Sequence, residues 1–136
     1  MTEVNPLPPG ILQFPEGLPG FENLTEFILL QDEELLPIVF LTSLVEPKIC
    51  LPVMPVQRIR QDYRLEIEEP DRRVLLLRED PVVGRNVLCL AVLTLGDGLQ
   101  PPTANLLAPI VVNVETWTAK QVIQLNSSYS TVADVG

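Results

Sequence analysis

Fourteen prolines are spread along the chain, and they constrain its fold more than any other feature. Each proline lacks a backbone N–H and biases the preceding residue away from the helical conformation, so long helices are excluded. Turn-forming stretches such as PEGLPG, GDG and QPPT separate short apolar runs. This spacing is typical of a protein built from short strands.

Seven short runs have the composition or the alternation of β-strands. The clearest is YRLEIEE, where Tyr63, Leu65 and Ile67 alternate with charged residues, as in a strand with one face in water. The seven runs span residues 26–31, 38–44, 48–53, 63–69, 86–95, 109–115 and 119–126.

Two short helical turns are expected, within residues 55–62 and 70–77, where Pro70 and Asp71 suit a first turn. The chain has 136 residues, of which 46% are hydrophobic, enough for one domain with a real core. We therefore predict a mostly β fold: a single compact antiparallel β-barrel-like domain over residues 1–136, with one or two short helices. Residues 1–12 are expected to be a flexible N-terminal segment.

The acidic residues are unevenly distributed along a chain whose net charge is -9. From Met1 to Pro47 there is no lysine or arginine, but there are eight carboxylates: Glu3, Glu16, Glu22, Glu26, Asp32, Glu33, Glu34 and Glu46. The negative charge argues against direct binding of nucleic acid, which depends on lysine and arginine. The acidic stretch could serve solubility, or it could attract a basic partner and repel RNA.

The groups that usually carry catalysis are mostly missing. There is no histidine, which excludes a Ser-His-Asp triad and a histidine-containing metal site. No glycine-rich phosphate loop is present. We expect no metal, no cofactor and no enzymatic activity, with a carboxylate-based hydrolase using DEE or EIEEPD as the alternative.

The sequence predicts a cytoplasmic protein. Its N-terminus lacks the basic region of a signal peptide, and no run reaches the ~20 apolar residues of a membrane helix. Cys50 and Cys89 lie in apolar runs, so we expect reduced, inert core thiols, with a disulfide or a reactive cysteine as the alternative.

Asn105 stands in TANLLAPIVVN, directly before a β-branched apolar run. Asparagine bonds its own nearby backbone, and Pro109 is tolerated at the beginning of a strand. We therefore interpret Asn105 as part of a turn before a strand. The alternative is that this turn, together with Tyr63, shapes part of a partner surface.

Three blocks of sequence resemble the FliW family of flagellar assembly factors. They are FPEGLPGFENLTEFILL; PIVFLTSLVEPKICLPVMPV followed by Asp62 and Tyr63; and TANLLAPIVVN followed by KQVIQLNSSYS. They stand in the family's order from Phe14 to Tyr129. Two departures are the absence of the family's glycine before the last block, near Trp117, and the prolines of LPVMP, which are expected to end a strand early.

The resemblance implies a non-enzymatic protein that binds flagellin and the carbon storage regulator CsrA in the bacterial cytosol. The regulator is a small basic RNA-binding protein that represses flagellin translation, and the two partners exclude one another, so the factor relieves repression when flagellin is secreted. We therefore expect this protein to bind the C-terminal region of flagellin and, separately, the regulator. A binding module of the same fold with another partner is the alternative. The candidate partner-binding residues are Asp32, Glu33, Glu34, Asp62, Tyr63, Asn105, Leu106 and Trp117.

Overall fold

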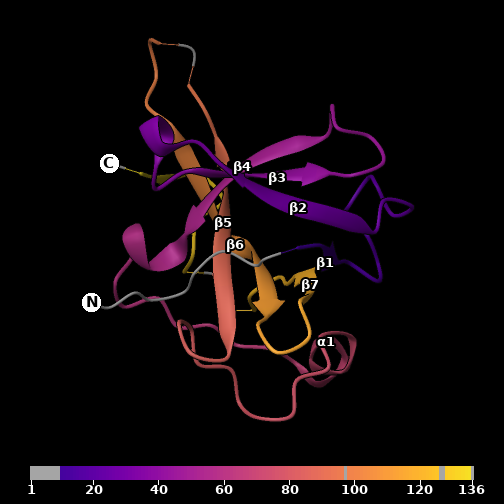
Figure 1. Ribbon diagram of the computed structural model, residues 1–136. Helices are drawn as coiled ribbons and strands as arrows, with labels where there is room; N and C mark the ends of the chain where they lie inside the picture. The colour runs from indigo at the N-terminus through magenta and orange to yellow at the C-terminus, as the bar shows by residue number, and fades with distance from the viewer. Residues whose placement is uncertain (1–9, 97, 126–127, 136) are drawn as a thin grey trace.

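The computed structural model describes residues 10–96, 98–125 and 128–135. Its elements, in chain order, are β1 (Leu12–Gln13), β2 (Glu26–Gln31), the 3-10 helix η1 (Glu33–Leu35), β3 (Val39–Ser43), β4 (Cys50–Pro55), the 3-10 helix η2 (Val56–Arg58), α1 (Glu69–Val74), β5 (Val87–Thr94), β6 (Thr103–Asn113), β7 (Thr118–Gln121) and β8 (Ala133–Asp134). These strands lie in the order β5-β4-β3-β2-β1-β7-β6-β8 (Figure 1). An additional pairing of β5 with β6 closes seven of them into a barrel, which confirms the predicted fold.

Neighbouring strands are antiparallel in every pair except β1–β7. The run at 26–31 is β2 without adjustment, and the runs at 38–44, 48–53, 86–95, 109–115 and 119–126 each overlap a strand. The expected helical turns at 55–62 and 70–77 contain η2 and α1. The short helices therefore follow from the proline spacing as predicted, whereas β6 is longer, at 11 residues, and contains Pro109.

β5 is buried on both of its faces, which explains its unbroken apolar sequence. Leu88 and Leu90 pack inside the barrel with residues such as Phe14, whereas Cys89 and Leu93 belong to a second, outer cluster. A strand covered on both sides needs no polar face. This is why the run at 86–95 shows no alternation.

The long connection between β4 and β5 covers the outer cluster. Val56, Tyr63, Leu75 and Val83 come from it and pack in the cluster with Leu106 of β6. The connection thus lies over the outer face of the β5–β6 hairpin, and α1 lies beside β7 (Figure 1). It gives the barrel a second layer on this side.

The strand predicted at 63–69 is wrong. Residues 63–68 form no strand, and α1 begins at Glu69. The Glu66 N–H donates to Gln124 Oε1 (2.9 Å), and Gln124 Nε2 donates to the Glu66 carbonyl (3.0 Å). A side-chain amide therefore replaces the neighbouring strand, so the alternation of Tyr63, Leu65 and Ile67 marks an extended chain with one buried face but no ladder.

The turn predicted before a strand at Asn105 is also wrong in its placement, because β6 already includes this residue. Leu90 pairs with Ile110 but Val92 pairs with Asn105, so β6 carries a bulge here. Asn105 Oδ1 accepts from the N–H groups of Leu107 and Ala108, both at 3.0 Å. The asparagine bonds its nearby backbone as expected, but inside a strand.

β4 does not end early at its prolines; it continues to Pro55. Pro52 lies opposite Phe40, and pairing with β5 begins at Val53. The hydrogen bond at Ser43 fixes the alternation of the β3–β4 ladder so that the nitrogen of Pro52 points away from β3. No N–H is needed at that position, so the strand tolerates proline.

Only one of the two cysteines is a core thiol. Cys89 is buried and burial raises the pKa of its thiol, but Cys50 is exposed at the start of β4, which corrects the sequence prediction. Both are free cysteines. Cys50 accepts a hydrogen bond from the Thr42 hydroxyl across the β3–β4 pair (3.3 Å).

The flexible segment predicted at residues 1–12 falls mostly on residues 1–9, which lie outside the described residues. Leu12, at the end of that segment, is fully buried in the barrel as part of β1.

Candidate partner-binding site

An apolar groove of about 380 Å³ opens at the end of the barrel next to η1. We call it the β2–β5 groove, and its lining residues are Leu29, Gln31, Leu36, Pro37, Val39, Pro55, Gln57, Arg58, Val83, Gly84, Leu88, Cys89 and Leu90. Leu36 remains 47% exposed on its rim, and Leu30 of the adjoining strand is 49% exposed. Concave apolar surface with exposed large side chains is typical of sites that bind a partner.

The three acidic site candidates of the first third stand directly beside this groove. Asp32 follows β2 and caps η1, with Oδ1 accepting from the Glu34 N–H at 3.0 Å. Glu33 and Glu34 occupy the first turn, where the positive end of a helix favours carboxylates. All three are exposed. The predicted acidic cluster is therefore an accessible rim of the groove.

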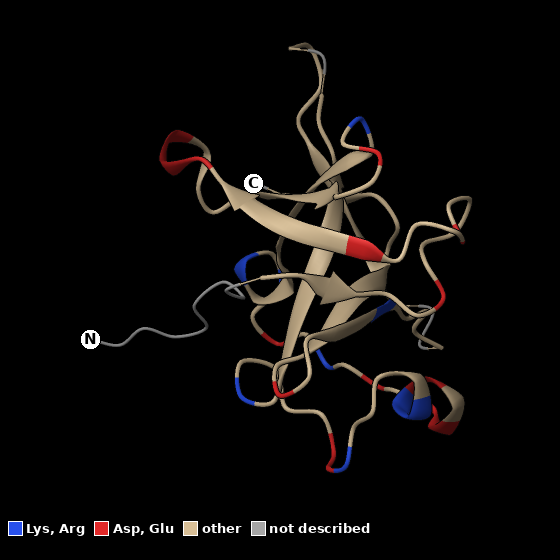
Figure 2. Ribbon diagram, turned by 45° about the vertical axis from the view of Figure 1, so that its right-hand side comes forward, with Lys and Arg blue, Asp and Glu red and all other residues tan. Residues whose placement is uncertain are grey.

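Glu26 and Glu16, two other acidic residues of the first third, do not join this rim. Glu26 begins β2 at its opposite end, roughly 17 Å from Gln31, the last residue of β2 before η1. Glu16 lies farther along the same end and pairs with Lys120 (2.6 Å). Figure 2 shows the acidic segments separated in this way, with η1 apart from the others. The acidic stretch thus forms more than one patch.

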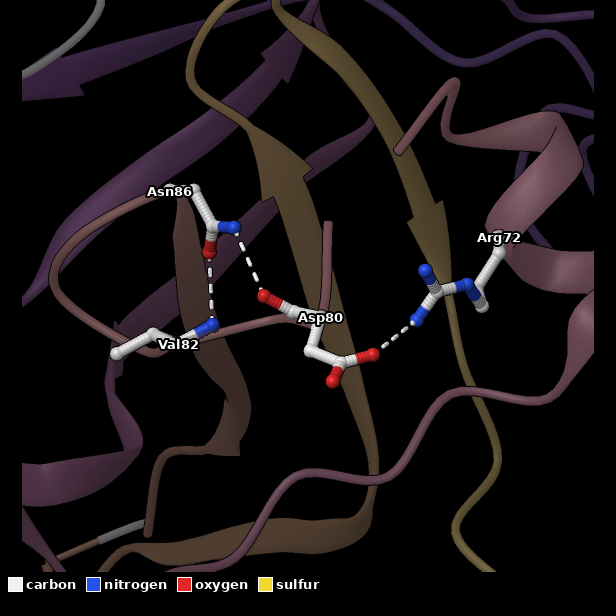
Figure 3. A network of polar contacts seen from close by, with 4 residues as sticks. All are labelled: Arg72, Asp80, Val82 and Asn86. Atoms are coloured by element: carbon white, nitrogen blue, oxygen red, sulfur yellow. Dashed lines mark hydrogen bonds and ion pairs between the residues drawn. The ribbon is translucent and has the colours of Figure 1, made fainter. Parts of the chain in front are cut away.

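Polar contacts hold the groove's far wall, which contains Val83 and Gly84. Asn86 Oδ1 accepts from the Val82 N–H (2.7 Å), and its Nδ2 donates to the Asp80 carbonyl (2.9 Å) (Figure 3). The Asp80 carboxylate in turn accepts from Arg72 of α1 (3.1 Å). The wall is tied to α1 in this way.

Tyr63 and Leu106, two of the candidates, are in direct contact. The Tyr63 hydroxyl donates to the Leu106 carbonyl at 2.6 Å, and both residues are buried. Tyr63 stacks on Tyr129 with ring centroids 4.3 Å apart, and Arg60 lies 5.3 Å above the Tyr129 ring. Burial limits the side chains of Tyr63 and Leu106 to shaping the surface.

Asp62 forms the exposed edge of this aromatic cluster. Its Oδ1 pairs with Arg60 Nε at 3.1 Å. The hydrogen bond and charge of Arg60 lower the pKa of Asp62, and those of Asp62 raise the pKa of Arg60.

Burial, followed by the nearby Cys89 and Tyr129, raises the pKa of Tyr63. The tyrosine is therefore neutral and remains a hydrogen-bond donor at physiological pH.

A second hollow, of about 430 Å³, joins Tyr63 to the groove. Gln57 and Val83 line both hollows, so the two lie side by side. The structure thus brings Tyr63 and its neighbours to the same side as the groove.

Trp117 lies elsewhere. It is half-buried, packs against the core inside the barrel, and its carbonyl accepts from the Gln13 N–H (2.9 Å). Its φ of 57° is the left-handed conformation that glycine favours. The tight turn is therefore kept without the family's glycine.

The groove's apolar lining was missed by the sequence analysis. Leu36 comes from the β2–β3 connection, whereas Arg58 and Val83 stand 25 positions apart in the β4–β5 connection, and no local pattern links them. The one available signal was the pair of leucines next to the acidic cluster, Leu35 and Leu36, which a short polar turn does not require.

Residues 10–96, 98–125 and 128–135 contain no group of three or more His, Cys, Asp or Glu side chains that could hold a metal ion. In the same part of the chain no helix has the length and apolar character to cross a membrane.

Comparison with known proteins gives a consistent result. A family model described as FliW protein matches residues 1–135. The flagellar assembly factor FliW of Pseudothermotoga lettingae is 41% identical over 121 residues, covering 88% of this chain and 74% of that protein. The FliW of Bacillus subtilis is 32% identical over 126 residues, covering 93% and 85%. A crystal structure of the flagellar assembly factor FliW matches with a TM-score of 0.82 and 28% identity, over 99% of this chain and 92% of that one.

Proposed function

The chain belongs to the FliW family of flagellar assembly factors, and on that premise we propose that it binds flagellin in the bacterial cytosol and antagonises the carbon storage regulator CsrA. The match of the family model over residues 1–135 carries this proposal. The protein acts as a chaperone of flagellin and, through the regulator, as a control on flagellin translation. It does so as one domain and without catalysis.

Two features of the surface support a binding role over a catalytic one. The β2–β5 groove is apolar, and the residues that line it include no Asp or Glu. A carboxylate-based hydrolase needs two carboxylates that face a shared substrate site. The exposed acids of η1 support a binding role, because exposed carboxylates attract the cations of a basic partner.

The charge of the chain supplies a physical route to antagonism. Its net charge is -9, and a negative protein held next to an RNA-binding surface repels incoming phosphates without occupying the RNA site. The same charge steers a basic regulator toward the complex.

The test is a titration of purified protein with full-length flagellin and with flagellin lacking its C-terminal region, read by calorimetry and gel filtration. We expect a complex with the first and none with the second. Adding the regulator to the preformed complex should leave a complex of one kind or the other, never all three proteins together. Absence of heat and of a complex with full-length flagellin would refute the proposal.

A further inference from the structure

The barrel is incompletely paired along β2. On one side β3 pairs with β2 from Phe27 to Gln31. On the other side β1 pairs with it only at Glu26 and Phe27. No described strand pairs with Leu29 or Gln31 on the β1 side. Within residues 10–96, 98–125 and 128–135, the second half of β2 is therefore a sheet edge.

The direction of the backbone groups along this edge follows from the ladder. The Leu44 N–H donates to the Glu26 carbonyl (3.0 Å), so Glu26 and every second residue after it bond toward β3. The N–H and C=O groups of Leu29 and Gln31 consequently point to the unpaired side. The Phe14 N–H, which donates to the Thr25 carbonyl from the β1 side, fixes the same alternation (2.8 Å).

The unpaired edge lies in the wall of the β2–β5 groove, because Leu29 and Gln31 both line it. A helix lying in the groove would leave these backbone groups without protein partners, since its own backbone bonds are internal. An extended chain would pair with them, as in strand addition, and would place alternate side chains in the groove. The edge therefore selects an extended occupant over a helical one.

Charge further restricts the occupant. Asp32, Glu33 and Glu34 follow directly from this edge of β2, so one end of an added strand lies against three exposed carboxylates. The groove itself offers Leu36, Val39 and Leu90 to apolar side chains. An occupant with alternating apolar residues and a terminal lysine or arginine fits both.

We propose that the free edge of β2 binds an extended segment of a partner protein, apolar on alternate positions and basic at its end, by strand addition into the β2–β5 groove. The inference rests on the proposed function only for the identity of the protein that supplies the segment.

The test uses a synthetic peptide of alternating valine and threonine with lysine at both ends, added to ¹⁵N-labelled full-length protein. We expect the amide resonances of Leu29 and Gln31 to shift most. A twin peptide with alternate backbone nitrogens methylated keeps every side chain but loses donors, and it should bind at least tenfold more weakly. A twin with glutamate at both ends should also bind more weakly.

Two variants at one position isolate the backbone bond. Gln31→Pro removes an N–H that β3 does not use, and it should weaken peptide binding about fivefold, the loss of one ordinary hydrogen bond. Gln31→Ala keeps the N–H and should change binding less than twofold. Thermal unfolding, followed by the fluorescence of Trp117, checks that both variants fold.

Several results would overturn the proposal: equal binding of the methylated twin, shifts confined to another surface, or shifts at Leu29 and Gln31 that grow with protein concentration alone, which would mean pairing of two copies. Failure of the strand-addition site can be distinguished from failure of the proposed function. If flagellin and the regulator bind the parent protein but the peptide binds Gln31→Pro as tightly as the parent, the strand-addition site is refuted while the proposed function stands. If the peptide binds the parent protein as expected but neither flagellin nor the regulator does, the strand-addition site stands while the proposed function is refuted.

Discussion

The Tyr63 hydroxyl donates a 2.6 Å hydrogen bond to the Leu106 carbonyl and so fastens the β4–β5 connection to β6. The bond meets β6 at its bulge, between Asn105 and Ile110, where pairing with β5 shifts its register. It is buried, and it closes a contact between residues that are 43 positions apart in sequence. The hydrogen bond of Tyr63 therefore helps to hold the second layer of the fold on the barrel.

Tyr63→Phe should lower the free energy of unfolding by about 1–3 kcal/mol, because it leaves the Leu106 carbonyl buried without its partner. Urea denaturation, followed by the fluorescence of the single tryptophan, measures the loss. Tyr129→Phe is the matched control: Tyr129 accepts from the Arg64 N–H (2.8 Å), and Arg64 is exposed, so water can replace the phenol. An equal loss in the two variants would contradict a special role for Tyr63.

Alkaline pH should destabilise the protein through the same residue. Because burial raises the pKa of Tyr63, the folded state favours the neutral phenol; its contribution is fully present below the ordinary tyrosine pKa of about 10 and is lost as pH rises beyond it. Buried Cys89, with its raised pKa, acts in the same direction from a lower pH. Urea midpoints between pH 8 and 11 should fall less steeply for Tyr63→Phe than for the parent. Parallel curves would exclude Tyr63 as a source of the effect.

The fold was predictable because most strands are local patterns. The run at 26–31 became β2 unchanged, since its residues alternate between core and surface and turn formers lie on both sides. The segment at 63–69 failed because alternation reports a half-buried extended chain, not its partner. The partner there is the side-chain amide of Gln124, 58 residues away from Glu66, and no local pattern contains it.

The candidate site was predictable only in part, for the same reason. The exposure of Asp32, Glu33 and Glu34 could be predicted, because a block of acidic residues near a turn is usually solvated. Tyr63 and Leu106 were candidates because of the resemblance to the family. Both side chains are buried, so they pack beneath the surface and shape it. The β2–β5 groove could not be predicted, because its lining is assembled by tertiary packing from β2, β3, β4, β5 and two connections.

Asn105→Ala should destabilise the protein by about 1–2 kcal/mol. Its side-chain oxygen accepts from two backbone N–H groups of the β6 bulge, and alanine leaves both without this acceptor. Asn105→Asp keeps an acceptor oxygen in the same place and should recover most of the loss. Chemical denaturation compares the two variants, and hydrogen exchange at Leu107 and Ala108 should accelerate in the alanine variant alone. If aspartate is as harmful as alanine, the side-chain bonds do not explain the role of Asn105.

The acidic rim beside the groove should govern how fast a basic regulator associates. Replacing Asp32, Glu33 and Glu34 together by Asn, Gln and Gln removes three exposed charges and preserves the η1 cap, because asparagine caps a helix as well as aspartate does. We expect the association rate of CsrA to fall several-fold while dissociation changes little, since exposed rim charges act mainly on encounter.

Salt provides the second arm of this experiment. Exposed charges are screened beyond a Debye length of about 8 Å at physiological ionic strength, so raising the salt concentration should slow association with the parent protein. The triple variant should respond less, because part of the charge that salt screens is already gone. Glu16 and Glu26 stand at the far end of β2, so Glu26→Gln serves as a control that changes charge without changing the rim. Stopped-flow measurements at two salt concentrations compare the three proteins. If the rate depends on salt equally in all of them, steering comes from the net charge of -9 as a whole, and the η1 rim has no particular part in it.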